Sequence, residues 1–493
     1  MTATPSPLDL NSLTRPRRTP SRLPFTKLVA TIGPASEGCL PELIERGMSV
    51  ARINFSHGSA EEHRRRADIV RKAAREAGRP IAILADIQGP KLRMGRFIGG
   101  SLDLEKDQEL TVRQGGEVAE EGELFFNFDG FLQAVGVGHR VLLADGAVEA
   151  VVTEQARQSF RMRVTRAGTV ADRKGVNLPD SELDVALPTE KDIEDIRLSR
   201  QIGVDMIGVS FVGSADDVDA VRELAPDQQI VSKIERSVAL ERITEILAAS
   251  DGIMVARGDL GVELPLERLP LIQKSLITEG LRAGKFVITA TEMLESMIHS
   301  SRPTRAEVAD VANAVLDGTD AVMLSAETAV GRYPREAVDV MARIAQAVES
   351  SERYRALPRV EFRGSEPTFS NAIAMAAVDA AEALGIQKII AFTETGNTVR
   401  LLSRYRPEAE LIALTPNEHT LNQIAILAHV RPLLFPRQRN LEEMLQDASL
   451  FLLDGGHVRA GEQVLFVAGV PPGVARTTNM MKLHRIGEQL KFS

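Results

Sequence analysis

Short apolar runs bounded by turn-forming residues recur along the chain, and stretches with the spacing of amphipathic helices separate them. Such runs are typical of buried parallel strands, and the stretches between them are typical of helices that cover a sheet. Eight strands are predicted, at 26–33, 49–56, 80–87, 205–211, 229–235, 251–258, 286–293 and 321–328. Helical patterns follow seven of them, around 40–47, 59–77, 214–224, 237–249, 265–283, 303–317 and 334–350.

The third strand is the exception, because the next helical pattern comes only at 189–202. The intervening residues alternate polar and apolar over short stretches and are rich in glycine, which predicts an inserted small β-barrel domain, residues 96–180. At that place in the chain it would act as a lid over the catalytic face of a barrel. A plain structural insertion is the alternative.

Eight alternating strand–helix units predict a closed (β/α)₈ TIM barrel, residues 25–95 and 181–355, with an open doubly wound sheet as the alternative. The alternation starts again beyond about residue 360, which predicts a C-terminal open α/β domain, residues 356–493. In that domain the loop at 393–398 joins a strand to a helix N-terminus, where free N–H groups favour an anion. A capped turn without any ligand is the alternative.

Charge and cysteine content narrow the class of protein. The formal net charge of −9 argues against a general nucleic-acid binder. No apolar run approaches the roughly 18 residues that a membrane span requires. The lone Cys39 cannot form an intrachain disulfide, which favours a reducing, cytoplasmic location. Residues 1–24 hold four Arg and five Pro, so we expect a disordered tail there, with an organelle transit peptide as the alternative.

Polar residues gather at the carboxyl ends of the predicted strands. In a barrel these ends converge on one site, whereas polar groups elsewhere on strands are costly to bury. Six different strands contribute, which is more than loop polarity requires. The residues are Arg52, Asn54, Ser56, Asp86, Lys233, Glu235, Arg257, Asp259, Thr289, Thr291, Glu292, Ser325 and Glu327.

This set fits a metal and an anionic substrate. Glu235 and Asp259 offer the hard oxygen ligands that Mg²⁺ or Mn²⁺ prefers. Arg52 and Lys233 are cations directed at the same space, as a phosphorylated substrate requires. A structural network of ion pairs is the alternative, although it would not also gather Asn, Ser and Thr side chains.

Several common catalytic motifs are absent from the sequence. It contains neither a G-x-x-x-x-G-K-[ST] loop nor a G-x-G-x-x-G turn after a strand, so a nucleotide would be held without those cradles. The absence of H-E-x-x-H and of cysteine pairs argues against zinc. A serine hydrolase is not indicated, since no G-x-S-x-G elbow is present.

Longer motifs resemble those of pyruvate kinases, in the same order along the chain. They are TIGPAS at 31–36, ARINFSHG at 51–58, KGVNLP at 174–179, SKIE at 232–235, MVARGDLG at 254–261, ATEMLESM at 290–297, RPTRAE at 302–307 and MLSAET at 323–328. The resemblance runs from about residue 26 to the end of the chain and is weakest within 100–135 and 350–370. It implies an enzyme of glycolysis that transfers the phosphoryl group of phosphoenolpyruvate to ADP, giving pyruvate and ATP.

The resemblance also implies roles for individual residues. Glu235 and Asp259 correspond to the protein ligands of Mg²⁺ or Mn²⁺. Lys233 and Arg52 correspond to the cations on the transferring phosphoryl group. The substrate carboxylate is expected at Gly258, Asp259 and Thr291, and proton delivery to the enolate at Thr291 and Ser325, with Glu327 beside that route. The nucleotide positions are Asn54, His57, Asp145 and Lys174.

One departure from the family concerns the monovalent cation. Many pyruvate kinases hold K⁺ at the counterparts of Asn54, Ser56, Asp86 and the carbonyl of Ile87, with a glutamate nearby. Lys91 stands where these members carry that glutamate. Because an ammonium group can supply the charge of a bound K⁺, we expect no K⁺ requirement. A Lys91 side chain that points to solvent is the alternative.

The resemblance further implies a homotetramer and an effector site in the C-terminal domain. A phosphorylated effector is expected at the loop of Thr393, Thr395, Gly396, Asn397 and Thr398. Two competing functions remain at this point. One is another barrel enzyme that uses phosphoenolpyruvate, and the other is a catalytically weak sensor of phosphorylated metabolites.

Overall fold

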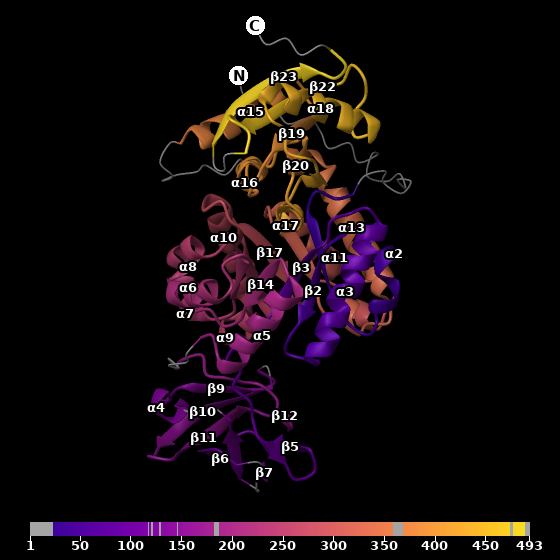
Figure 1. Ribbon diagram of the computed structural model, residues 1–493. Coiled ribbons are helices and arrows are strands. Elements are labelled where there is room, and N and C mark those ends of the chain that lie inside the picture. Colours follow the sequence, from indigo (N-terminus) through magenta and orange to yellow (C-terminus); the bar gives the residue numbers. More distant parts are fainter. Residues whose placement is uncertain are drawn as a thin grey trace, which may run out of the picture.

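The computed structural model describes residues 23–116, 118–119, 122–127, 130–144, 146–181, 187–357, 368–473 and 477–488. Three bodies follow one another along its length (Figure 1), with the C-terminal domain at one end, the barrel in the middle and the inserted domain at the other end. The predicted tail lies outside the described residues except for Leu23 and Pro24. Asp145 also lies outside them.

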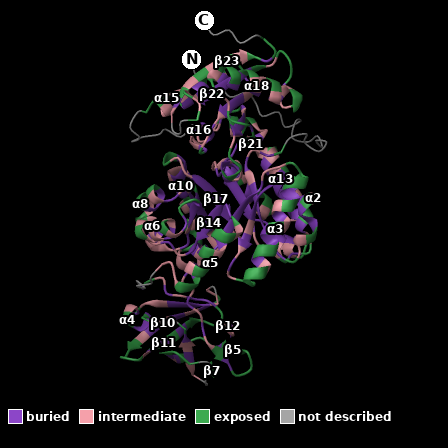
Figure 2. Ribbon diagram, viewed as in Figure 1, coloured by how far each residue is buried: buried purple, intermediate pink, exposed green. Residues whose placement is uncertain are grey.

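Eight parallel strands close into a barrel, which confirms the predicted fold class. The strands are apolar because both of their faces are covered, and Figure 2 shows them as the buried centre of the molecule. They are β1 (Lys27–Thr31), β2 (Met48–Asn54), β3 (Ala82–Asp86), β14 (Met206–Val209), β15 (Gln229–Ile234), β16 (Gly252–Ala256), β17 (Phe286–Ala290) and β18 (Ala321–Leu324).

Helices surround the barrel near the predicted positions. Four of them begin with a capping box, in which a Ser or Thr and an acidic residue three positions later satisfy each other's backbone N–H groups. The helices are α2 (Leu40–Glu45), α3 (Ala60–Glu76), α5 (Glu190–Ile202), α6 (Ala215–Leu224), α7 (Ser237–Glu241), α8 (Ile243–Ala249), α10 (Leu269–Arg282), α11 (Arg305–Leu316) and α13 (Pro334–Glu349).

Two predictions of element boundaries were wrong. Most strands end two to four residues earlier than predicted, because the chain turns into a loop or a short helix at the barrel rim; one example is α9 (Arg257–Glu263), where the sequence pattern showed only the end of a strand. The predicted helix at 237–249 is interrupted at Arg242, so α7 and α8 are separate.

The inserted domain packs its strands around a separate apolar core. It holds a six-stranded sheet in the order β13-β9-β10-β11-β6-β8 and two pairs, β12-β5 and β4-β7. Its elements are β4 (Arg96–Phe97), β5 (Ser101–Leu104), β6 (Glu109–Gln114), β7 (Val118–Ala119), β8 (Glu123–Phe126), α4 (Phe131–Ala134), β9 (Arg140–Leu143), β10 (Val148–Gln155), β11 (Ser159–Arg166), β12 (Gly168–Ala171) and β13 (Val176–Asn177).

The C-terminal domain is an open α/β sheet in the order β21-β20-β19-β22-β23, parallel except for its last pair. Helices lie on it as predicted, and one of them, α17, continues into a 3₁₀ turn. The elements are α15 (Phe369–Ala383), β19 (Lys388–Phe392), α16 (Asn397–Ser403), β20 (Glu410–Thr415), α17 (Glu418–Gln423), η4 (Ile424–Ile426), β21 (Val430–Leu434), α18 (Leu441–Asp454), β22 (Gln463–Gly469) and β23 (Thr478–Arg485).

The amino end of the barrel is closed by the C-terminal domain. Residues of η4 belong to the same apolar cluster as inward-facing residues of the barrel strands. We call the segment 424–427 the floor segment. It comprises Ile424, Ala425, Ile426 and Leu427, and it shares this cluster with Val50, Leu84 and Met254, among others. At the edge of this junction Arg406 forms an ion pair of 2.9 Å with the buried Asp320. The opposite, carboxyl end of the barrel faces the inserted domain (Figure 1).

Candidate active site

A buried group of charges lies where strands β2, β3 and β15 end. Asp86 is 2% exposed and accepts from two cations, with 2.7 Å to Nε of Arg52 and 3.1 Å to Nζ of Lys233. Lys233 also lies 2.7 Å from Oε1 of Glu235. The strand register explains the meeting, because Arg52 pairs with Leu84 and Asn54 with Asp86, so the ends of β2 and β3 are level.

The two cations are placed by neutral partners as well. Arg52 donates from Nη1 to the hydroxyl of Thr31 at the end of β1, over 2.9 Å. Lys233 donates to the hydroxyl of Ser210, over 2.7 Å. Both side chains are 12% exposed, so each cation keeps access to the space above the barrel.

Burial and charge shift the pKa values in this group. Burial is the largest influence on Lys233 and would lower the pKa of its ammonium group, but Asp86 and Glu235 outweigh it and raise that pKa above its usual value. Burial likewise opposes the charge of Asp86, yet Lys233 and Arg52 hold its pKa below its usual value. The lysine is therefore charged at any physiological pH.

Glu235 is the group with unbalanced charge. Burial raises the pKa of Glu235 to about 7, the neighbouring Asp259 adds to the rise, and Lys233 offsets only part of it. A divalent cation would relieve this cost, and carboxylate oxygens are the ligands that Mg²⁺ prefers. Among the described residues, no cluster of three or more His, Cys, Asp or Glu suited to a metal occurs.

Strands β16 and β17 contribute a second half of the site. The backbone N–H of Gly258, in the first turn of α9, donates to the hydroxyl of Thr291 over 2.7 Å. Thr291 and Glu292 have φ angles of 68° and 54°, a left-handed backbone conformation that is unusual for residues other than glycine. Arg257 holds this turn by donating to the carbonyl oxygens of Ala290 and Thr291. Gly258, Asp259 and Thr291 are thus brought to one corner.

Ser325 and Glu327 follow the last strand. Glu327 is fully buried, and its two carboxylate oxygens accept from the backbone N–H groups of Ser325 and Leu294, over 2.7 and 3.1 Å. Its carboxylate therefore ties the loop after β18 to the loop after β17. This arrangement positions Ser325, which is partly exposed.

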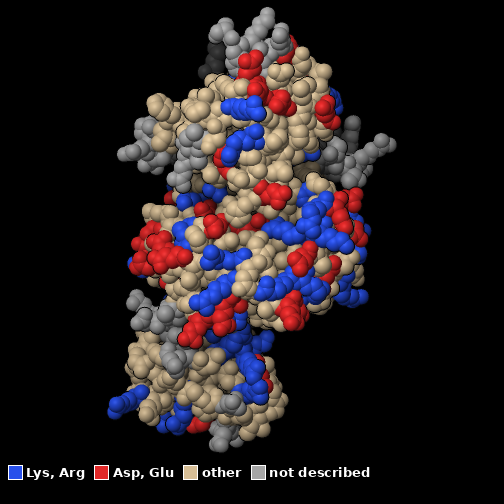
Figure 3. Space-filling model, in the orientation of Figure 1, with Lys and Arg blue, Asp and Glu red and all other residues tan. Residues whose placement is uncertain are grey.

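The other predicted site residues have different surroundings. Thr289 is fully buried and donates to Thr319 over 3.0 Å, away from the site. Asn54 accepts from the backbone of Ser56, and His57 is exposed. Lys174 is exposed on the inserted domain. Figure 3 shows Lys and Arg side chains gathered where the barrel meets that domain, with acidic side chains beside them.

Comparison with known proteins decides the family. Residues 23–338 match the family profile described as pyruvate kinase, barrel domain, and residues 371–484 match that described as pyruvate kinase, alpha/beta domain. The chain belongs to the pyruvate kinase family. The pyruvate kinases of Staphylococcus aureus strains USA300 and NCTC 8325 are each 42% identical to it over 474 residues, which cover 94% of this chain and 81% of theirs. The function of this family is phosphotransfer.

The motifs of the pyruvate kinase family fall on the geometry described above. The SKIE motif carries Lys233 and Glu235, and MVARGDLG forms the end of β16 and the first turns of α9. Their clustering is what the predicted roles require. The individual roles stay predictions.

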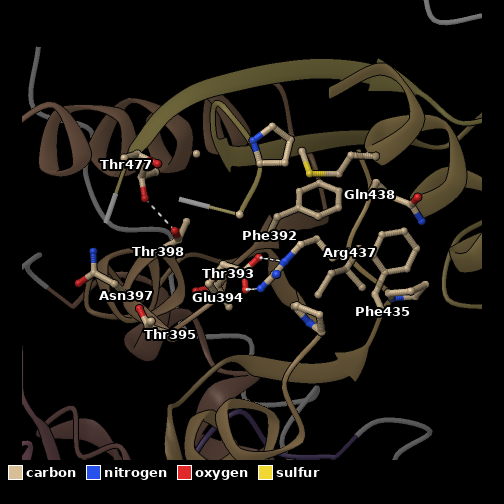
Figure 4. Close-up of a pocket in the computed structure, with 18 residues that line it drawn as sticks. Phe392, Thr393, Glu394, Thr395, Asn397, Thr398, Phe435, Arg437, Gln438 and Thr477 are labelled. Carbon is tan, nitrogen blue, oxygen red and sulfur yellow. Dashed lines mark hydrogen bonds and ion pairs between the residues drawn. The ribbon is translucent and has the colours of Figure 1, made fainter. Parts of the chain in front are cut away.

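The predicted effector loop lines a pocket in the C-terminal domain (Figure 4). Thr393 accepts from the backbone N–H of Gly396, and Thr398 pairs with Thr478. The neighbouring Glu394 is held by Arg437 through two hydrogen bonds of 3.0 and 2.6 Å. The sequence prediction missed this ion pair, because Arg437 lies beyond the next two strands.

No helix in the described part of the chain has both the length and the apolar character of a membrane span.

The sequence prediction also missed Ser210 and Phe211 at the end of β14. The signal was available, since Ser210 is a polar residue at the carboxyl end of a barrel strand like the others that were singled out.

Proposed function

We propose that this chain transfers the phosphoryl group of phosphoenolpyruvate to ADP, producing pyruvate and ATP, at the carboxyl end of the barrel. The observation that carries this proposal is the meeting of Lys233, Arg52 and Glu235 around the buried Asp86. Phosphoryl transfer needs little covalent chemistry from a protein and depends mostly on position and charge neutralisation. Two cations beside a metal-binding carboxylate supply both.

Glu235 and Asp259 would hold Mg²⁺ or Mn²⁺, which neutralises charge on the phosphoryl oxygens when bound. The raised pKa of Glu235 supports this, because it marks a carboxylate whose charge is poorly balanced by the protein alone. Lys233 and Arg52 would bind the transferring phosphoryl group, and Lys233 would also stabilise the enolate oxygen left behind.

The remaining residues would orient the substrate and deliver a proton. The substrate carboxylate would accept from the backbone N–H groups of Gly258 and Asp259 and from the Thr291 hydroxyl, replacing the present hydrogen bonds from the Gly258 N–H to Thr291 and from Thr291 to the Ala290 carbonyl oxygen. After the bond from phosphorus to the enol oxygen breaks, the enolate carbon takes a proton through Thr291 and Ser325. Glu327, with both of its oxygens bound to backbone, fits a positioning role for Ser325.

Nucleotide and monovalent-cation positions complete the proposal. Asn54, His57 and Lys174 would face ADP, with Asp145 of the inserted domain. Ser56, Asp86 and Ile87 would surround the place of the monovalent cation, and the ammonium group of Lys91, which is partly exposed, would take over its charge. The enzyme would then work without K⁺.

Assembly, location and regulation are proposed from the same family membership. We place a homotetramer in the cytoplasm, with a phosphorylated effector at the pocket of Thr393 and Thr398. Binding there would have to compete with Glu394 for Arg437.

A coupled assay for pyruvate tests the proposed reaction. Phosphoenolpyruvate and ADP should yield pyruvate and ATP with Mg²⁺, and the rate should vanish when the metal is chelated. Replacing K⁺ by a bulky organic cation should leave the rate within about twofold, since the ammonium group of Lys91 would supply the charge of a bound K⁺. A strong K⁺ requirement would refute the role of Lys91, and the absence of pyruvate formation would refute the reaction.

A further inference from the structure

Two residues at the end of β14 touch the two reactive side chains of the neighbouring strand. Ser210 accepts from Nζ of Lys233 over 2.7 Å, and the backbone N–H of Phe211 donates to Oε2 of Glu235 over 2.7 Å. We call Ser210 and Phe211 the β14 corner. Ser210 is buried, at 2% exposed, and Phe211 is half-buried.

The strand register places the corner beside Lys233. Val209, the last residue of β14, pairs with Ser232, so the next residue along β14 lies level with Lys233. The chain then turns sharply, because Phe211 has a φ of 61°. Such a conformation is costly for a bulky residue and persists only where its surroundings fix it.

Gly89 helps to fix the corner. Its φ is +67°, and a Cβ atom there would lie 3.0 Å from Cβ of Ser210 and 3.1 Å from the Ser210 carbonyl oxygen. Its backbone N–H donates to the buried Asp192 at the start of α5, over 2.9 Å. The loop after β3 therefore lies directly against the corner, and a larger residue in place of Gly89 would be strained by the positive φ and would crowd Ser210.

The hydroxyl of Ser210 has a defined direction. It donates to the carbonyl oxygen of Ile87 over 2.7 Å, so its proton points away from Lys233 and a lone pair is left for the ammonium group. An ammonium group has three donors. In Lys233 they meet Asp86, Glu235 and Ser210, which fixes the group from three sides.

We propose that Ser210 is a positioning residue that aims the Lys233 ammonium group at the transferring phosphoryl group, while the Phe211 N–H aims Glu235. Ser210 is the one uncharged partner of the three, so it holds Lys233 without adding negative charge beside the phosphoryl oxygens. This inference rests on the proposed phosphoryl transfer. Because Lys233 acts on charge that develops in the transition state, its misalignment lowers kcat more than it raises KM.

Ser210→Ala is the direct test, and Ser232→Ala is its matched control. Ser232 is a fully buried serine next to Lys233 on β15, and its hydroxyl pairs with Ser250 over 2.6 Å, away from the site. We expect Ser210→Ala to lower kcat by about 10- to 100-fold with the KM values for both substrates within about threefold. The control should keep kcat within about twofold.

Two further measurements distinguish a change in the orientation of Lys233 from a general disturbance of the site. The Mg²⁺ concentration for half-maximal activity should stay unchanged in Ser210→Ala, because Phe211 still holds Glu235 through its backbone. Ser210→Cys keeps the size of the side chain and a weak donor and acceptor, so its kcat should fall between those of the wild type and the alanine variant.

The proposal is overturned if Ser210→Ala and Ser232→Ala have equal kcat values, or if the loss appears in KM alone. Should the alanine variant not fold, the cysteine variant decides, and a kcat equal to that of the wild type would refute the role. A wild-type protein that forms no pyruvate would instead refute the proposed function, which keeps the two failures distinct.

Discussion

At the scale of single residues, the buried charges of Arg52, Asp86, Lys233 and Glu235 are paired with one another, and Lys233 offsets only part of the effect of burial on Glu235. Asp86 is 2% exposed and forms ion pairs with both Arg52 and Lys233, which links the two cations. Removing one member of such a buried group leaves the others uncompensated. Substitutions of these residues should therefore have large effects, and each effect should depend on which charge is removed.

Lys233→Met removes the cation expected on the transferring phosphoryl group and on the enolate oxygen. We expect kcat to fall by about 10³-fold or more, which corresponds to roughly 4 kcal/mol of transition-state stabilisation. The pyruvate assay measures it. Lys285→Met is the control, since Lys285, just before β17, is also partly buried but donates to the carbonyl oxygen of Ser250, outside the site. A Lys233 variant that retains half its rate would contradict the assignment.

His63 predicts how stability depends on pH. It stacks on Phe55 with ring centres 4.1 Å apart, is 3% exposed, and burial lowers its pKa to about 4. The unfolded chain takes up a proton near pH 6.5 and the folded chain only near 4, so stability is highest above 6.5 and falls between these values. The loss is at most about 3 kcal/mol. Thermal unfolding at pH 7 and pH 5 should show a smaller shift in His63→Phe than in the wild type, and equal shifts would contradict the prediction.

At the scale of elements, the sequence pattern located the strands and helices well and their ends poorly. Apolar runs mark strand interiors, but the barrel strands end where polar residues begin, and Glu235, Asp259, Thr291 and Ser325 all lie just beyond a strand. The short helix α9 escaped prediction because its seven residues include two glycines, which disfavour helices. Residue types and the common end of the strands sufficed to gather the charged site. The contacts of backbone N–H groups, such as that of Phe211, could not be predicted, because they do not depend on the type of side chain.

The N-terminus of α11 supports the loop that carries Thr291. Glu307 closes the capping box with Thr304 and also accepts from the backbone and hydroxyl of Ser296, over 2.7 and 2.6 Å. Glu307→Ala should lower the free energy of unfolding by about 1–2 kcal/mol and also reduce kcat. Calorimetry and the pyruvate assay test the two effects.

Glu336 provides the comparison for Glu307. It occupies the same third position of α13, whose N-cap residue Tyr333 makes no side-chain cap. Glu336→Ala should change the unfolding midpoint little. If both alanine variants behave alike, the cap of α11 does not stabilise this loop.

At the scale of the whole molecule, the barrel and the C-terminal domain share one apolar core through the floor segment. The Arg406–Asp320 pair borders it, and Asp320 also accepts from the backbone of Val287 in the barrel. The two parts are therefore joined by a packed junction as well as by the chain. Changes in the C-terminal domain have a direct mechanical route to the barrel strands.

Arg406→Leu should loosen this junction. It leaves the buried carboxylate of Asp320 without its cation, at a cost of about 3–5 kcal/mol, and the calorimetric transition should move down or split in two. Arg485→Leu removes an exposed pair with Glu488 and should have little effect. A single transition at an unchanged temperature in the Arg406 variant would show that the junction does not depend on this pair.

The floor segment also bears on how the protein is made. All eight barrel strands have left the ribosome once residue 324 has emerged, yet the side chains that seal their amino end arrive a hundred residues later, at 424–427. A nascent barrel must wait with an uncovered apolar opening for that interval, during which chaperones or neighbouring chains can bind it. The barrel core is therefore completed only when the C-terminal domain has been synthesised. Synthesis that stops before residue 424 should yield an insoluble product.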